Sequence, residues 1–322
     1  MRIHIIAADI GGTKTRLVLA RLEQNVEILY EARYRSPDFD SLDAMLAHFI
    51  AAAGQPNCNI DVLSLALPGA VEQDSVRLTN LPWVVSKPEL AQRFGTKQIY
   101  FMNDFQAAAL GVDQVDRDNL VVLNPGMHRN DATRAVIGAG TGLGLAWLQG
   151  TGSAATAWST EGGHIDFAPV NTRQIELLEF MLQRHTHVSF ERLVSGGGLV
   201  TLYEFCSRQP AEGIDGAWVH AEANAGNPLA REAMSLFVQI YGSYAGNIAL
   251  LFKPEGGIYI TGGIAGKIIN WRQSEDFITA YLAKGRMEAL ARTIPVYVVS
   301  DERTGVTGAL SHAVQRQQAT YS

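Results

Sequence analysis

Short apolar runs alternate with amphipathic stretches along the chain, and this alternation predicts an α/β fold built from sheet and helix layers. Buried strands are expected at residues 3–8, 17–20, 62–67, 98–102, 120–123, 135–137, 145–148, 257–261 and 296–299. Helical patterns are expected at residues 41–53, 107–110, 172–184, 228–252 and 305–315. The 228–252 helix has Asn227 as its expected N-cap and Pro228 at its first position.

Two glycine-rich turns repeat one pattern at a constant offset. The first reads Asp9-Ile10-Gly11-Gly12-Thr13, and the second Gly138-Ala139-Gly140-Thr141-Gly142. Apolar runs flank both turns, so each predicts a strand, a tight turn and a second strand. The tips would cradle an anion with backbone N–H groups and a Thr hydroxyl, because glycine lets the main chain approach a phosphate. The alternative is a pair of ordinary glycine hairpins.

The repeated strand-turn-strand unit predicts two related lobes with a cleft between them. A chain of 322 residues has enough length for two such domains. We expect a small α/β lobe from residues 1–114 plus 301–322, and a large α/β lobe from residues 115–300.

Composition excludes several classes of partner. The net charge is −6 and Lys and Arg form no long run, so no nucleic acid is expected. Residues 135–160 carry no charge but include six glycines, which favours a hairpin over a membrane helix, and no membrane partner is expected. The only cysteines, Cys58 and Cys206, suit a reducing compartment, so a cytoplasmic location is expected.

The motifs in combination resemble the bacterial glucokinases of the actin-like sugar kinase superfamily. The resemblance rests on both glycine turns, on Asn103-Asp104, on Glu161-Gly162-Gly163-His164 and on Gly262-Gly263. Further matches in the family's order are Leu67-Pro68-Gly69, Thr79-Asn80-Leu81-Pro82-Trp83, Lys284-Gly285-Arg286 and Ile294-Pro295-Val296-Tyr297.

This resemblance covers nearly the whole chain. It implies an actin-like (ribonuclease H-like) duplicated fold, ATP-dependent phosphorylation of a hexose, and a homodimer. Zinc-bearing relatives place a Cys-rich motif after a His in this region. Because Cys206 stands alone here, we expect no structural zinc.

The resemblance assigns the nucleotide to glycine-rich backbone. The β- and γ-phosphates of ATP are expected to contact Gly11, Gly12, Thr13, Gly140, Thr141 and Gly142. Asp9 would orient Mg²⁺, through water. Gly262 and Gly263 would lie against the adenosine, although a plain strand-to-helix turn would also place glycines there.

Asp104 is the candidate general base for the sugar 6-hydroxyl, and Asn103 would bond to neighbouring hydroxyls. Both follow a strand at its carboxyl end, where ligands of α/β sheets bind. The alternative for Asp104 is a first-turn helix residue whose charge the helix dipole stabilises, and the two interpretations can coexist.

Glu161, His164 and Glu191 match sugar-binding positions of the family, and their side chains suit hydroxyls, which both donate and accept. The alternatives are a satisfied loop histidine for His164 and a helix N-terminal charge for Glu191.

Glucose is the leading substrate. A kinase for another hexose, such as an N-acetylated or keto sugar, and a catalytically silent sugar sensor remain alternatives. An actin- or chaperone-like ATPase would lack the Glu161 and His164 sugar contacts.

Overall fold

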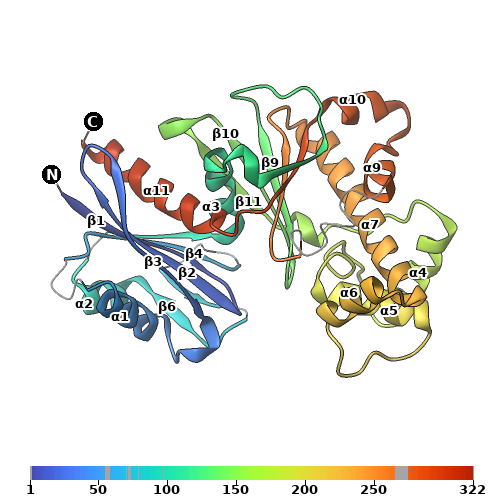
Figure 1. Cartoon of the computed structure of the whole chain (residues 1–322), viewed down its shortest axis with the longest axis horizontal. Helices are drawn as coiled ribbons and strands as arrows, with labels where there is room; N and C mark the ends of the chain where they lie inside the picture. The colour runs from blue at the N-terminus through green and yellow to red at the C-terminus, as the bar shows by residue number, and fades with distance from the viewer. Residues whose placement is uncertain are drawn as a thin grey trace. The chain divides into compact units, whose positions relative to one another are not determined.

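The computed structural model describes residues 2–54, 59–69, 71, 74–78, 80–96, 98–264 and 275–321. Cys58 and Thr79 lie outside these residues. The chain forms two compact units (Figure 1). Unit 1 comprises Met1–Val115, Thr151–Ser159 and Arg303–Ser322, and unit 2 comprises Asp116–Gly150 and Thr160–Glu302.

Unit 1 is built on a five-stranded sheet of order β3-β2-β1-β4-β7. Its strands are β1 (Ile3–Ile10), β2 (Lys14–Leu22), β3 (Val26–Arg35), β4 (Val62–Leu67) and β7 (Gln98–Asn103). The first three form an antiparallel meander, whereas β4 is parallel to both β1 and β7. A separate hairpin pairs β5 (Ser75–Arg77) with β6 (Val84–Ser86).

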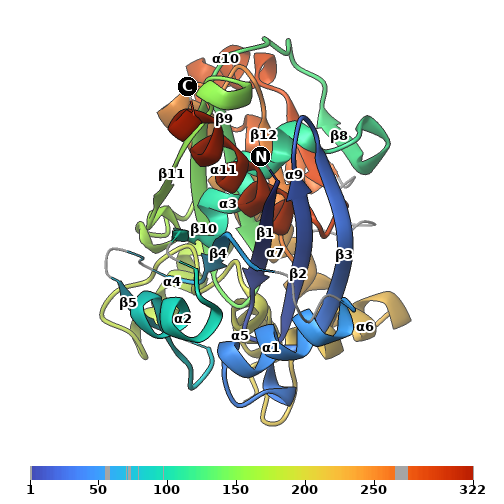
Figure 2. The same ribbon diagram turned by 90° about the vertical axis from the view of Figure 1, so that its left-hand side faces the viewer.

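Helices cover both faces of this sheet, as Figures 1 and 2 show. Successive side chains of β1 point to opposite faces. Ile6 therefore packs in one apolar cluster with Phe49 of α1, and Ala7 packs in another with Ala107 of α3 and Val306 of α11. The helices are α1 (Leu42–Ala52), α2 (Lys87–Phe94), α3 (Asp104–Gly111) and α11 (Thr304–Tyr321).

Unit 2 repeats the same strand order. The sheet runs β11-β10-β9-β12-β13-β8, with β9 and β10 antiparallel and β12 parallel to both β9 and β13. Its strands belong to unit 2 except β11, of which residues 156–159 belong to unit 1. The strands are β8 (Leu120–Asn124), β9 (Arg134–Ala139), β10 (Leu143–Gln149), β11 (Thr156–Thr160), β12 (Ile258–Thr261) and β13 (Val296–Val299). The expected duplication and α/β class are thereby confirmed.

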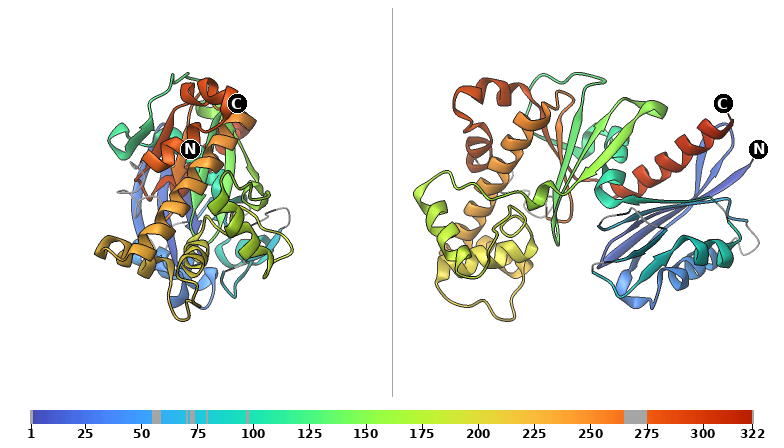
Figure 3. Two further views of the ribbon diagram at one scale, coloured as in Figure 1. Left: turned by 90° about the vertical axis from the view of Figure 1, so that its right-hand side faces the viewer. Right: turned by 180° about the vertical axis from the view of Figure 1, so that it is seen from behind.

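One continuous apolar core joins the sheet of unit 2 to its helices, whose largest member is α7 (Figure 3). They are α4 (Thr172–Leu182), α5 (Gly196–Ser207), α6 (Gly216–Ala225), α7 (Pro228–Phe252), α9 (Glu275–Leu282) and α10 (Glu288–Thr293). By length and composition alone α7 could cross a membrane, but 67% of its apolar window is buried inside the protein, which is typical of a core helix.

Most of the expected elements are present. The 228–252 helix is confirmed, and the Asn227 side chain caps it by accepting from Leu229 N and Ala230 N. Residues 135–160 form β9, β10 and β11 rather than a helix. Sequence patterns did not identify β3, whose residues are exposed or half-buried, nor the elements β5, β6, β11, α2, α5, α6, α9 and α10. Short 3-10 turns occupy Ser36–Asp38, Val112–Gln114, Arg117–Asn119, Gly152–Ala154, Gly162–His164 and Gly285–Met287.

Candidate active site

The first glycine turn connects β1 to β2, and Ser36 stabilises it through two hydrogen bonds. Gly11 N donates to Lys14 O at 3.0 Å, which closes the turn. Ser36 then donates twice, through its N–H to Thr13 O (3.0 Å) and through Oγ to Gly11 O (2.6 Å). Two carbonyl oxygens that would repel a phosphate are thus occupied by donors. Gly12 packs so closely that a Cβ there would lie 2.6 Å from Asn80 Cβ.

Asp9 is half-buried one residue before the end of β1, and its carboxylate lies against Gly305 in the first turn of α11. Burial raises the pKa of Asp9 to about 6, although the charge of Arg16 acts in the opposite direction. A cation beside this carboxylate would offset the cost of burying its charge. The residues present therefore fit a magnesium ion near Asp9.

Asn103 and Asp104 lie at the same edge of the unit 1 sheet as Asp9. The strands β1, β4 and β7 are parallel, and the register pairs Asp9 with Ala66 and Leu67 with Asn103. The carboxyl ends of three neighbouring strands therefore present these side chains together.

The helix α3 begins at Asp104, and Asn103 is its N-cap. Asn103 Oδ1 accepts from Phe105 N (2.9 Å) and Gln106 N (3.2 Å), while Nδ2 donates to Gly69 O at 3.0 Å. Asp104 Oδ1 accepts from Phe105 N at 3.0 Å. The first-turn location considered for Asp104 is thus confirmed. The N-cap fixes the start of α3 and with it the position of the half-buried Asp104 side chain.

The second glycine turn connects β9 to β10 in unit 2. Gly140 N donates to Gly142 O at 2.8 Å, and Gly140 O accepts from Gly196 N, also at 2.8 Å. At the end of the turn Leu143 N donates to Glu191 Oε2 at 2.9 Å. Thr141, at the tip, is exposed. Residues of one distant segment, 191–196, therefore hold the turn in place.

Three of the expected sugar-binding side chains gather beside this turn. His164 Nε2 lies 3.9 Å from Glu161 Oε2 and 3.7 Å from Glu191 Oε1. These distances exceed direct hydrogen bonds and leave the polar atoms available to a bridging water or hydroxyl. The side chains of Glu161 and His164 are 74% and 56% exposed, so a ligand can reach them.

Glycines bring this cluster onto β10. A Cβ on Gly162 would overlap the Leu145 side chain, and one on Gly163 would overlap Leu143 O. The two glycines thus let the segment pack closely against β10, while the side chains of Glu161 and His164 on either side of them remain exposed. The proposal that Glu191 is a helix N-terminal charge is wrong, because α5 begins at Gly196 with Ser195 as its N-cap.

Gly262 and Gly263 follow β12 at the same sheet edge as the second turn. Gly262 has φ +93°, and a Cβ on it would lie 2.8 Å from Ala139 O, the residue before Gly140. Ile264 N donates to the same oxygen at 3.2 Å. A Cβ on Gly263 would meet no atom of the described residues within 4 Å.

Among the described residues, no group of three or more His, Cys, Asp or Glu side chains is arranged to hold a metal ion. Cys206 is buried, and burial raises the pKa of its thiol to about 12. The absence of zinc stays a prediction.

Comparison with known proteins identifies the family. The sequence model of the glucokinase family matches residues 6–316. The chain belongs to the glucokinase family. A glucokinase from a Nostoc strain is 36% identical over 333 residues, covering 95% of this chain and 97% of the relative. The glucokinase of Chromohalobacter salexigens is 36% identical over 319 residues, covering 98% of each chain.

Solved structures agree with this glucokinase assignment. A crystal structure of glucokinase from an Antarctic psychrotroph matches with a TM-score of 0.83 at 31% identity, covering 96% of this chain and 98% of that one. A ROK family glucokinase from Streptomyces griseus, in complex with glucose and AMPPNP, matches with a TM-score of 0.65 at 19% identity, covering 98% and 99%. The latter shows the fold alone. The expected actin-like fold is confirmed.

Sequence reasoning missed the charged residues around Asp9. Glu31 accepts from Arg16 at 2.8 Å and pairs with Arg303 at 3.0 Å. No local sequence pattern predicts this cluster of charged side chains, because Arg303 lies far along the chain from Glu31.

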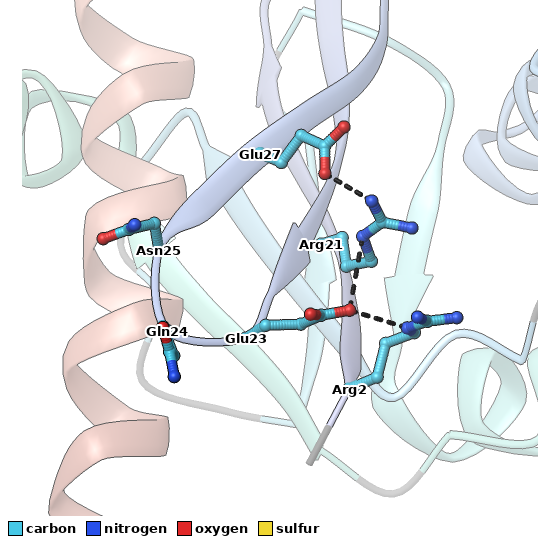
Figure 4. A pocket seen from close by; sticks show the side chains of 6 residues that line it. All are labelled: Arg2, Arg21, Glu23, Gln24, Asn25 and Glu27. Carbon is cyan, nitrogen blue, oxygen red and sulfur yellow. Dashed lines mark hydrogen bonds and ion pairs between the residues drawn. The ribbon is translucent and has the colours of Figure 1, made fainter.

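A separate surface hollow lies at the β2–β3 turn (Figure 4). It is lined by Arg2, Arg21, Glu23, Gln24, Asn25 and Glu27. Arg2 donates to Glu23 at 2.7 Å, and Arg21 pairs with Glu23 and Glu27. The hollow lies at the opposite end of the β1–β2 hairpin from Gly11, so it is remote from the phosphate turn, and exposed pairs of this kind stabilise a fold little.

Proposed function

We propose that this glucokinase-family chain transfers the γ-phosphoryl group of ATP to the 6-hydroxyl of glucose, giving glucose 6-phosphate and ADP. The observation that carries the proposal is the direct contact in unit 2 between a candidate sugar residue and a candidate phosphate turn. Glu191 Oε2 accepts from Leu143 N while Oε1 faces His164. A hexose and a polyphosphate bound to this unit would therefore lie side by side.

The sugar would be held by Glu161, His164 and Glu191. The carboxylates accept from hydroxyls, and the imidazole donates or accepts according to its tautomer. The 3.7 and 3.9 Å separations around His164 leave each polar atom room for a hydroxyl. Asn103 would add a donor, since its amide carries a second N–H besides the one given to Gly69 O.

Asp104 would act as general base. Its carboxylate takes the proton of the 6-hydroxyl as the oxygen attacks the γ-phosphorus and the bond to the β-phosphate oxygen breaks. Its position at the start of α3, next to a capped helix end, restricts its motion. Orienting the hydroxyl in line with the leaving group supplies part of the rate acceleration.

The phosphates would be held by the backbone of Gly11, Gly12 and Thr13 in unit 1 and of Gly140, Thr141 and Gly142 in unit 2. A magnesium ion, when bound with ATP, neutralises charge on the β- and γ-phosphates. Asp9 would hold it through water. The adenosine would lie against Gly262 and Gly263, both of which are exposed.

In this proposal residues 1–114 with 301–322 form the lobe that supplies the base, and residues 115–300 form the lobe that supplies most sugar contacts. We further propose a cytoplasmic homodimer that binds neither nucleic acid nor membrane. The dimer rests on family resemblance, and the location on the two cysteines and the charge of the chain.

A coupled ADP-release assay with ATP and Mg²⁺ across a panel of hexoses tests the function. Glucose is expected to give the highest kcat/KM. Preference for an N-acetylated or keto sugar would support the alternative hexose kinase. Binding of a hexose without ADP release would support the sugar sensor and contradict the proposal.

A further inference from the structure

The carboxylate of Glu191 has two separate sets of contacts. Oε2 accepts the Leu143 N–H at 2.9 Å, at the end of the second glycine turn. Oε1 lies 3.7 Å from His164 Nε2, on the side where the expected sugar contacts gather. The side chain is 30% exposed, so one side of the group is accessible while the other is committed to backbone.

Close packing makes this contact sensitive to the shape of the turn. A Cβ on Gly142 would lie 2.6 Å from Glu191 Oε2, so only glycine allows the carboxylate to lie there undisturbed. Backbone hydrogen bonds also join residues 191–196 to both neighbouring segments. Glu191 N donates to Gly163 O at 2.9 Å, and Gly196 N donates to Gly140 O at 2.8 Å. Residues 191–196 thus contact both the sugar segment and the turn.

We propose that Glu191 is a positioning residue for the second phosphate turn, so that hexose binding and nucleotide binding are coupled through its carboxylate. The inference rests on the proposed function. A sugar hydroxyl that donates to Oε1 restrains the carboxylate, and the restrained Oε2 then fixes the Leu143 N–H and the turn before it. A phosphate binding to an ordered turn loses less conformational entropy. Because the coupling is a free energy between two sites, it must act equally in both directions.

The first test alters the second glycine turn and measures the affinity for glucose. Gly142→Ala displaces Glu191 Oε2 without removing any sugar-binding group. The Kd for glucose without nucleotide, measured by calorimetry, is expected to rise at least about fivefold, the low end of typical coupling. Gly197→Ala is the matched control, because its Cβ meets no atom within 4 Å and the residue belongs to neither candidate binding set, and its glucose Kd is expected to stay near the wild-type value. Unchanged glucose affinity in Gly142→Ala overturns the proposal.

The reciprocal test alters the Glu191 carboxylate and measures the affinity for a nucleotide. Glu191→Asp keeps the charge but shortens the reach to Leu143 N. The Kd for AMPPNP with Mg²⁺, in the absence of sugar, is expected to rise at least about fivefold. Glu161→Asp makes the same chemical change at another sugar contact and is expected to leave this Kd unaltered. A residue that only binds sugar would give the wild-type value in both variants, and that result contradicts the coupling.

Failure of the inference differs from failure of the proposed function. A wild-type chain that releases ADP with glucose, combined with unchanged Kd values in both variants, refutes the coupling alone. A wild-type chain that does not bind glucose refutes the proposed function and the coupling together. Thermal unfolding accompanies each variant, and if Gly142→Ala does not fold, the Glu191→Asp measurement decides.

Discussion

Gly308 of α11 lies directly on the carbonyl oxygen of Ala107 in α3, with no room for a side chain between the two helices. Gly111 of α3 approaches Thr304 O of α11 just as closely. Small residues on both helices thus permit this close crossing. Since α3 begins at Asp104, the position of the candidate base depends on a helix that lies far from it in the sequence.

Replacing Gly308 with Ala is expected to push α3 and α11 apart. Overpacking of this kind costs about 1–3 kcal/mol, which exceeds the gain of about 1 kcal/mol in helix propensity. Urea unfolding should show the loss. Gly197→Ala is the control, because its Cβ enters open space in the first turn of α5, and it should not lower stability. Equal stabilities of the two variants would contradict the packing argument.

Asp104→Ala is expected to lose roughly 10²-fold or more of kcat while retaining hexose binding, because the proton acceptor is removed and the sugar contacts remain. Steady-state kinetics and calorimetry measure the two quantities separately. Asp118→Ala, in a 3-10 turn of unit 2, is the control. Near-normal turnover in the Asp104 variant would exclude this residue as the base.

Gly305→Ala should displace the Asp9 carboxylate, because a Cβ at residue 305 would overlap Oδ2. The Mg²⁺ concentration for half-maximal ADP release is then expected to rise by about tenfold, as for an orienting group that is moved rather than removed. A magnesium titration at saturating ATP and glucose measures it. Asp9→Asn should shift the titration in the same direction, and an unshifted curve in both variants would exclude Asp9 from metal binding.

His312 of α11 should make unit 1 sensitive to acid. Burial lowers its pKa to about 4, with a smaller contribution from Arg316, and its ring packs edge-on against Tyr100. A histidine that is harder to protonate in the folded state contributes stability above its unfolded pKa of about 6.5, and this stability is lost as the pH falls toward 4.

Urea unfolding at pH 7 and pH 4.5 measures this contribution, which amounts to at most about 3 kcal/mol. His312→Gln is expected to flatten the dependence. Asp9, whose pKa is raised to about 6, changes stability in the opposite direction over this range, so the contribution of His312 is the difference between wild type and His312→Gln. An identical pH dependence in the two proteins would show that His312 is not buried as described.

The sequence predicted the elements that carry strong local signals. Glycine marks both turns because neighbouring atoms approach closely: a Cβ on Gly11 would lie 2.8 Å from Lys14 O, and one on Gly142 would lie 2.6 Å from Glu191 Oε2. Asn227-Pro228 marks a helix start for equally local reasons. The strand β3 lacked such a signal, because its side chains lie at an exposed sheet edge and alternate poorly between polar and apolar.

Contacts between distant segments could not be predicted. The family resemblance predicts that Glu191 is a sugar ligand but says nothing about its bond to Leu143 N, which depends on how residues 190–196 fold onto β10. The Arg16, Glu31 and Arg303 cluster likewise requires α11 to return to the first sheet. Residue types indicate the chemistry, whereas tertiary packing decides which atoms meet.

The return of α11 also orders events during synthesis. Residues 304–321 emerge from the ribosome only after all of unit 2, so one face of the first sheet, with Ala7, Val18 and Ala20, stays open to water in the growing chain. The apolar cluster on this face, which also contains Ala107 of α3, can therefore be completed only after unit 2 has been synthesised.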